Sequence, residues 1–141
     1  MTRILLLLLT ALVIAQPALG QGASLSQRWT GIWFGSGQPG DRSQMYIDTF
    51  NADGSFRAQH RACVQGKSFD QAQAGRWRVE GNTLIVDIAT VDGFAEPRTD
   101  RYRINSADGK IQDYTYLQNN FGYRARKVDA RFKMPPCDLT S

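Results

Sequence analysis

The chain has 141 residues, of which 42% are hydrophobic and 11% aromatic, and its formal net charge is +4. This length suits one domain with its own hydrophobic core, and no stretch has the composition of a linker or the period of a repeat. The excess of 17 basic over 13 acidic side chains is mild, so the charge does not indicate a nucleic-acid-binding protein.

Residues 1–20 have the three parts of a secretory signal peptide. A basic start at Arg3 precedes an apolar run from Ile4 to Ala15, and small residues lead to Gly20. The run is about a dozen residues long, whereas a membrane-spanning helix needs ~20. We therefore expect cleavage after Gly20 and a mature single domain over 21–141, with no membrane span. This domain is expected to be a monomer in a periplasm or outside the cell.

The two cysteines, Cys63 and Cys137, are predicted to form a disulfide. An exported protein meets an oxidising environment, and the pair lacks C-x-x-C spacing. A zinc site is the alternative, but it would need further ligands, and His60 is the only histidine of the chain. We expect neither a metal ion nor a cofactor.

Apolar and polar residues alternate along most of the remaining chain, as is typical of half-buried β-strands. Turn residues divide this pattern into eight predicted strands: 30–36, 43–50, 55–63, 72–80, 83–89, 98–105, 110–118 and 121–128. Short strands with tight turns predict an all-β fold, an eight-stranded antiparallel up-and-down barrel, because closing the sheet removes its exposed edges.

The C-terminal tail is predicted to be an extended strap. It contains Phe132, Met134 and two prolines, and it ends near Cys137. We expect it to cover apolar surface such as Met45 and Ile47, with the disulfide fastening it to the third strand.

The turn at 51–54 allows two registers for the first hairpin. A glycine bulge places Phe50 opposite Phe56, whereas a four-residue loop puts Asp48 across from Arg57 and separates the two phenylalanine rings. The bulge is favoured because it buries both rings and turns the cysteine of the third strand outward. It also places a tyrosine of the second strand opposite the histidine of the third.

The dipeptide at 81–82, Gly-Asn, is typical of a two-residue hairpin turn. It places Trp77 opposite Val86 on an apolar face. On the other face it places Arg76 opposite Asp87, which predicts a cross-strand ion pair.

The dipeptide at 119–120, Asn-Asn, suits a second turn of this kind, because asparagine tolerates a positive φ. It pairs Tyr116 with Tyr123 on one face and Asp113 with Arg126 on the other. Aromatic rings again occupy one face and charges the opposite face.

The first predicted strand carries the motif Gly31-x-Trp33. Together with the eight-strand meander it resembles the first-strand signature of the lipocalins and their small calycin-like bacterial relatives. In that family a basic residue late in the last strand packs across the tryptophan, and either Lys127 or Arg131 could match it. A second signature reads T-D-Y, and the similar stretch 99–102 has an extra arginine. The resemblance implies an internal cavity for a small apolar or amphipathic ligand.

The inner faces of the predicted strands carry the candidate ligand-binding residues, most of which are aromatic. They are Trp33, Tyr46, Asp48, Phe56, His60, Trp77, Tyr102, Tyr114, Tyr116 and Tyr123. Buried tyrosines need partners for their hydroxyl groups, so several together indicate a polar-tipped pocket or trapped water. A core filled by its own side chains is the alternative, because a barrel of eight strands can be filled or hollow.

We expect a binding protein and not an enzyme. His60 near Asp48 is the only candidate acid–base pair, and it is equally explained as a core histidine. His60 as an axial haem ligand is a weaker alternative. The alternative function is an inhibitor of a secreted protease or lysozyme that acts through exposed loops at 34–43 and 89–98.

Overall fold

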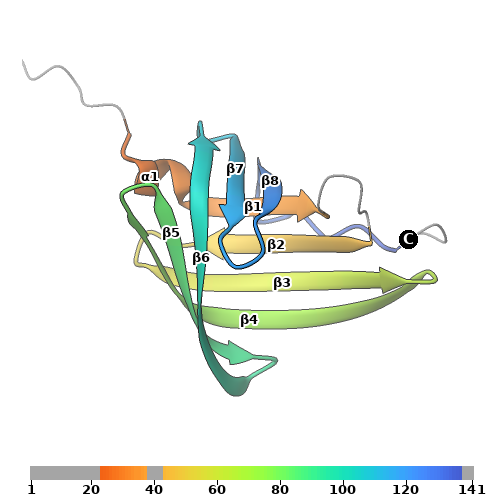
Figure 1. Ribbon diagram of the computed structural model, residues 1–141. Coiled ribbons are helices and arrows are strands. Elements are labelled where there is room, and N and C mark those ends of the chain that lie inside the picture. The colour runs from red at the N-terminus through yellow and green to blue at the C-terminus, as the bar shows by residue number, and fades with distance from the viewer. Residues whose placement is uncertain (1–22, 38–42, 138–141) are drawn as a thin grey trace, which may run out of the picture.

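A computed structural model describes residues 23–37 and 43–137. Over these residues the chain forms a closed antiparallel barrel in which each strand pairs with the next and the last pairs with the first (Figure 1). The strands are β1 (Gly31–Ser36), β2 (Gln44–Phe50), β3 (Ser55–Val64), β4 (Lys67–Glu80), β5 (Thr83–Val91), β6 (Phe94–Ala107), β7 (Ile111–Tyr116) and β8 (Phe121–Val128). The predicted all-β, eight-stranded up-and-down barrel is confirmed. The predicted signal peptide lies outside the described residues.

One short helix, α1 (Leu25–Trp29), precedes β1. Ser24 caps it, because its hydroxyl accepts a hydrogen bond from the backbone N–H of Gln27 while the Gln27 side chain accepts one from the backbone N–H of Ser24. The helix places Trp29 in the hydrophobic core, where its fully buried ring meets Phe50 and Tyr114 edge-on. The alternation pattern does not predict this helix, since five residues are too few to show helical periodicity.

β-Bulges bend the sheet where β4, β5 and β6 pair. The register shifts between Ala74 and Gly75 and again between Ile88 and Thr90. A Cβ atom at Gly75 would lie 2.0 Å from the backbone oxygen of Asp87, so only glycine lets the two backbones approach this closely. In Figure 1, β2, β3 and β4 run side by side across the view, and β5 and β6 cross them.

Two hairpins are longer than the sequence pattern predicts. β4 begins at Lys67 instead of residue 72, and β6 begins at Phe94 instead of residue 98. The predicted loop at 89–98 is therefore wrong: apart from a turn at 92–93, these residues belong to β5 and β6. Most side chains of the two extensions are exposed, so no apolar alternation marks them as strands. The other predicted loop, 34–43, begins with three residues of β1, and its positions 38–42 lie outside the described residues.

The bulged register of the first hairpin is confirmed. Phe50 lies opposite Phe56, with the ring centroids 5.2 Å apart, and Tyr46 lies opposite His60. Gly54 adopts a φ of +82°, a conformation that glycine reaches without strain. Since side chains alternate between the two faces of a sheet, this register turns all four of these aromatic side chains toward the barrel interior.

The turn at 81–82 gives the predicted register of β4 and β5, but not the predicted ion pair. Arg76 is opposite Asp87. Asp87 nevertheless pairs with Arg78, a diagonal neighbour within reach of a long side chain. The guanidinium of Arg76 instead donates to the backbone oxygen of Asp53 at 2.9 Å.

The predicted register of β7 and β8 is wrong by two residues, because the turn between them has four residues instead of two. Tyr123 is opposite Tyr114, and Arg124 instead of Arg126 is opposite Asp113. A shift of two residues leaves every side chain on its predicted face. The inner aromatic face and the outer charged face are therefore kept.

The predicted disulfide between Cys63 and Cys137 is formed, with the Cα atoms 5.5 Å apart. It fastens the C-terminal strap, residues 129–137, to β3. Arg61 adds a second attachment, because its guanidinium donates to the backbone oxygen of Pro135 at 3.0 Å.

The strap also crosses the seam at which β8 meets β1. This seam has three residue pairs, the shortest ladder of the barrel. Phe132 of the strap packs on Phe34 of β1, with ring centroids 4.8 Å apart, and the guanidinium of Arg126 from β8 lies about 5 Å from both rings. One cluster therefore joins the first strand, the last strand and the strap.

Candidate functional site

One end of the barrel is closed around Trp33, the tryptophan of the G-x-W motif. Its side chain is fully buried, and its indole N–H donates to the backbone oxygen of Trp29 at 2.8 Å. Lys127 lies across this ring, with its Nζ 5.3 Å from the centroid, and donates to the backbone oxygen of Thr30 at 3.1 Å. Lys127, and not Arg131, is therefore the basic residue that covers the tryptophan.

A cavity of about 470 Å³ occupies the barrel interior. This volume falls within the ~300–1,000 Å³ that is usual for small-molecule sites. Side chains from β2 through β8 line it: Tyr46, Asp48, Phe50, Phe56, His60, Gln71, Gln73, Leu84, Val86, Ile88, Arg98, Thr99, Asp100, Tyr102, Tyr114, Tyr116, Gln118 and Tyr123. The side chains of the barrel therefore fill its interior only in part.

Apolar side chains form the floor of the cavity. Phe50, Phe56 and Leu84 line it and are each at most 5% exposed. Trp77 supports this floor, because its ring meets Phe50 edge-on at 5.3 Å and its indole N–H donates to the backbone oxygen of Asn51 at 2.8 Å. A ligand reaching the floor would meet a buried apolar surface.

Tyrosine rings form a wall above the floor. Tyr114 stacks on Tyr123 with centroids 5.5 Å apart, and Tyr102 meets Tyr114 edge-on at 5.6 Å. The hydroxyl of Tyr114 donates to that of Tyr46 at 2.9 Å. These rings offer faces and hydroxyl groups to the same space.

Burial raises the pKa of Tyr46, Tyr102 and Tyr114, because the phenolate form would lose its hydration. The negative charge of Asp48 adds to the rise in pKa of all three. These side chains therefore remain neutral phenols at physiological pH and keep their hydroxyl protons for hydrogen bonds.

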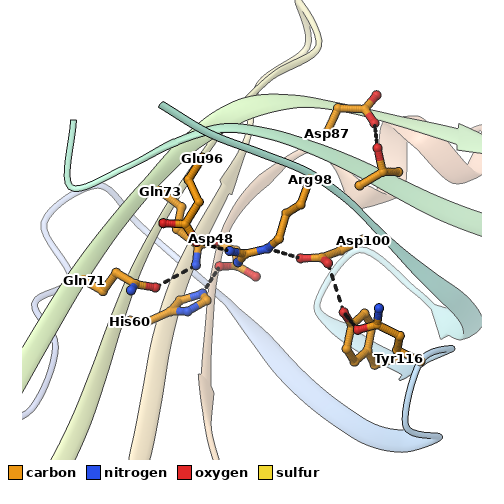
Figure 2. A network of polar contacts seen from close by, with 11 residues as sticks. Asp48, His60, Gln71, Gln73, Asp87, Glu96, Arg98, Asp100 and Tyr116 are labelled. Atoms are coloured by element: carbon orange, nitrogen blue, oxygen red, sulfur yellow. Dashed lines mark hydrogen bonds and ion pairs between the residues drawn. The ribbon is translucent and has the colours of Figure 1, made fainter. Parts of the chain in front are cut away.

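The mouth of the cavity holds the network of polar side chains in Figure 2, centred on Arg98. Its guanidinium lies 3.3 Å from the carboxylate of Glu96 and 3.4 Å from that of Asp100. Asp100, whose side chain is 11% exposed, accepts a hydrogen bond from the hydroxyl of Tyr116 at 3.0 Å. Partial burial and this hydrogen bond raise the pKa of Tyr116.

Asp48 lies on the cavity wall beside His60 (Figure 2). The imidazole Nε2 is 3.8 Å from Oδ1 of the carboxylate, which is too long for a hydrogen bond. That Oδ1 is buried and has no hydrogen-bond partner among the described residues. Nearby, the side-chain amide of Gln73 donates to that of Gln71 at 2.9 Å, so two amides from β4 also face this part of the cavity.

Most of the predicted site residues line the cavity: Tyr46, Asp48, Phe56, His60, Tyr102, Tyr114, Tyr116 and Tyr123. The other two, Trp33 and Trp77, close and support the barrel instead. The sequence pattern missed Arg98 and Asp100 as lining residues. Both lie within the predicted strand 98–105 and share the inward phase of Tyr102, so the alternation alone would have found them.

Within the two described stretches, the His, Cys, Asp and Glu side chains form no group of three suited to a metal ion. Over the same stretches, no helix has the length and apolar character needed to cross a membrane. No protein-family model matches the sequence, and no curated protein matches it significantly. The function is therefore argued from the cavity and its side chains.

Proposed function

We propose that the protein binds a small amphipathic molecule inside the barrel and acts as an exported, lipocalin-like binding protein. The observation that carries this proposal is a cavity of about 470 Å³ that combines an apolar floor with a polar mouth. Apolar surface removed from water contributes about 25 cal/mol per Å², so the floor supplies affinity. The polar mouth orients the ligand.

Contacts among the side chains around the cavity support this proposal. Arg98, Asp100 and Tyr116 hold one another in place at the mouth, and Trp77 braces the floor. A site whose side chains are already fixed loses little conformational entropy when a ligand enters. Export is supported by the disulfide, because such bonds persist in oxidising compartments.

A neutral fluorescent probe, N-phenyl-1-naphthylamine, tests this proposal by titration into the purified mature protein. We expect saturable enhancement of its fluorescence at one site. Val86→Trp should reduce the affinity at least tenfold, because Val86 is buried and lines the cavity. Ala89→Trp is the matched control, since Ala89 lies on the same strand with an exposed side chain outside the cavity lining.

Equal probe binding by the Val86→Trp and Ala89→Trp variants, both shown to be folded by thermal unfolding, would contradict binding in the barrel. Native mass spectrometry of the protein purified from its source organism gives a second test. We expect a co-purifying small molecule, which the Val86→Trp variant should lack.

The second candidate, an inhibitor of a secreted hydrolase, is favoured by one observation. Phe94, next to the turn of the long β5–β6 hairpin, is 78% exposed. A projecting hairpin with an exposed aromatic side chain suits insertion into the cleft of another protein. Inhibition of lysozyme or of a secreted protease by the wild type, lost in Phe94→Ala, would support this candidate. No inhibition across such a panel would exclude it.

A further inference from the structure

The carboxylate of Asp48 is the least satisfied polar group of the cavity. Its side chain is 14% exposed, and its Oδ1 has no hydrogen-bond partner among the described residues. A buried charge is usually paired, because the loss of hydration is otherwise uncompensated. Asp100 shows the usual arrangement, since it lies beside Arg98 and accepts a hydrogen bond from Tyr116. Unlike Asp100, Asp48 therefore has an acceptor oxygen left for a donor that enters the cavity.

The positive side chains near Asp48 do not take this role. The guanidinium of Arg98 is shared by Glu96 and Asp100. His60 lies 3.8 Å away with a 44% exposed side chain, and it carries a charge only when protonated. Two carboxylates and one guanidinium line the cavity, so its charge is negative while His60 is neutral. This balance favours a cation over an anion.

The aromatic rings around Asp48 suit the same kind of guest. Tyr46, Tyr102 and Tyr114 all line the cavity, and the charge of Asp48 acts on each of them. The face of an aromatic ring attracts an ammonium group, and cages of such rings recognise cationic amines. A carboxylate among tyrosine rings therefore combines a hydrogen-bond acceptor for N–H groups with a surface that tolerates their charge.

We propose that the ligand is a small organic amine whose protonated nitrogen donates a hydrogen bond to Asp48 among the tyrosine rings, while its apolar body rests on Phe50, Phe56 and Leu84. This inference rests on the proposed function and narrows the ligand class. An ammonium group with at least one N–H is required, because a buried oxygen without a partner needs a donor.

Calorimetric titration with three compounds that share an indole ring and differ in their head group tests the inference. Tryptamine carries an ammonium group, tryptophol a hydroxyl and indole-3-acetate a carboxylate. We expect tryptamine to bind at least tenfold more tightly than tryptophol, and indole-3-acetate to bind most weakly. Only the ammonium group of tryptamine adds attraction between opposite charges to the hydrogen bond, and this attraction is stronger beside a poorly hydrated carboxylate than in water, which supports a gap of this size.

Asp48→Asn keeps the size of the side chain and removes its charge. We expect this variant to lose 10- to 100-fold in affinity for tryptamine and to lose much less affinity for tryptophol, which carries no charge. It should unfold at the same or a higher temperature, because an unpaired buried carboxylate has been removed. Asp113→Asn is the control, since it removes the same charge from a residue that pairs with Arg124 and does not line the cavity.

Each outcome decides between the alternatives. Tryptophol binding as tightly as tryptamine, or an unchanged tryptamine affinity in Asp48→Asn, overturns the amine proposal while the barrel-binding function stands. Failure of all three compounds to bind while the neutral fluorescent probe still binds also overturns it. If the probe does not bind either, the result contradicts the proposed function itself, and the amine proposal that rests on it is overturned too.

Discussion

The substitution Gly35→Ala tests how the first strand makes room for the cavity wall. Gly35 is the cross-strand partner of Tyr46. A Cβ atom at this glycine would lie 2.1 Å from Cζ and 2.2 Å from the hydroxyl oxygen of the tyrosine. The ring is not free to swing away, because its hydroxyl accepts a hydrogen bond from Tyr114 and its edge packs on Tyr123.

The expected magnitude follows from these contacts. Forcing an extra methyl group into a packed core typically costs about 1–3 kcal/mol, and a lost hydrogen bond adds about 1 kcal/mol. We therefore expect Gly35→Ala to lower the free energy of unfolding by about 2–4 kcal/mol. Gly122→Ala is the control, because nothing lies within 4 Å of the added Cβ atom, and it should be neutral or stabilise by up to about 1 kcal/mol.

Urea unfolding followed by tryptophan fluorescence measures both variants. A double-mutant cycle adds the decisive comparison, since Tyr46→Leu removes the ring atoms that meet the new methyl group. In that background, Gly35→Ala should have less than half of its effect. Two results would refute the packing argument. One is a change in the free energy of unfolding that agrees between Gly35→Ala and Gly122→Ala within about 0.5 kcal/mol, and the other is an effect of Gly35→Ala that is the same with and without Tyr46→Leu.

Three further predictions concern the fastenings of the barrel. Replacing both Cys63 and Cys137 with serine should lower the free energy of unfolding in urea by about 4 kcal/mol, because the bond closes a sequence separation of 74; an unchanged urea midpoint would contradict this. Lys127→Met keeps the aliphatic part of the side chain but removes the charge above Trp33, so it should lower the free energy of unfolding in urea by about 0.5–2 kcal/mol. An unchanged free energy of unfolding would show that this contact does not stabilise the barrel. Hydrogen bonds from Arg124 hold the pKa of Asp113 below its usual value. Above the unfolded pKa of about 4, the ionised carboxylate therefore stabilises the fold, and this stabilisation is lost as the pH falls through the lower pKa of the folded protein. Thermal unfolding from pH 6 to 2 should therefore show a shallower loss of stability in Asp113→Asn than in the wild type, and identical curves would argue against the linkage.

The barrel could be predicted from the sequence because its interior and exterior impose opposite demands on alternate residues. Phe50 and Phe56 needed a common face, and that requirement selected the bulged register over the four-residue loop. The error at the last hairpin did little harm, since a slip of two residues moves Tyr123 from one inward partner to another. The face of the sheet on which a side chain lies was therefore more predictable than the residue opposite it on the next strand.

The site residues that the sequence pattern did not predict also have a physical explanation. Arg98 lies where the predicted loop 89–98 meets the predicted strand 98–105. Its inward phase could be read from the sequence, but nothing in the sequence shows that carboxylates hold its guanidinium at the mouth of a cavity. Gln73 shares the inward phase of Trp77 on the predicted strand 72–80, but a polar side chain at this position did not indicate a cavity wall. The missing partner of Asp48 depends on three-dimensional surroundings that no periodicity encodes. The apolar part of the site was thus predictable, and most of its polar part was not.

From the short seam between β1 and β8 we expect the tendency of the protein to aggregate to depend on the redox state of the surroundings. With only three residue pairs, this ladder is the place where thermal fluctuation would first unzip the cylinder, and the aromatic cluster around Phe132 spans it. Reduction of the disulfide removes the covalent fastening between β3 and the strap that carries this phenylalanine, and leaves the weaker contacts of Arg61 and Phe132 to hold it. Opening of the seam would expose two strand edges to other molecules, so we expect a reducing environment to favour edge-to-edge aggregation over the closed barrel.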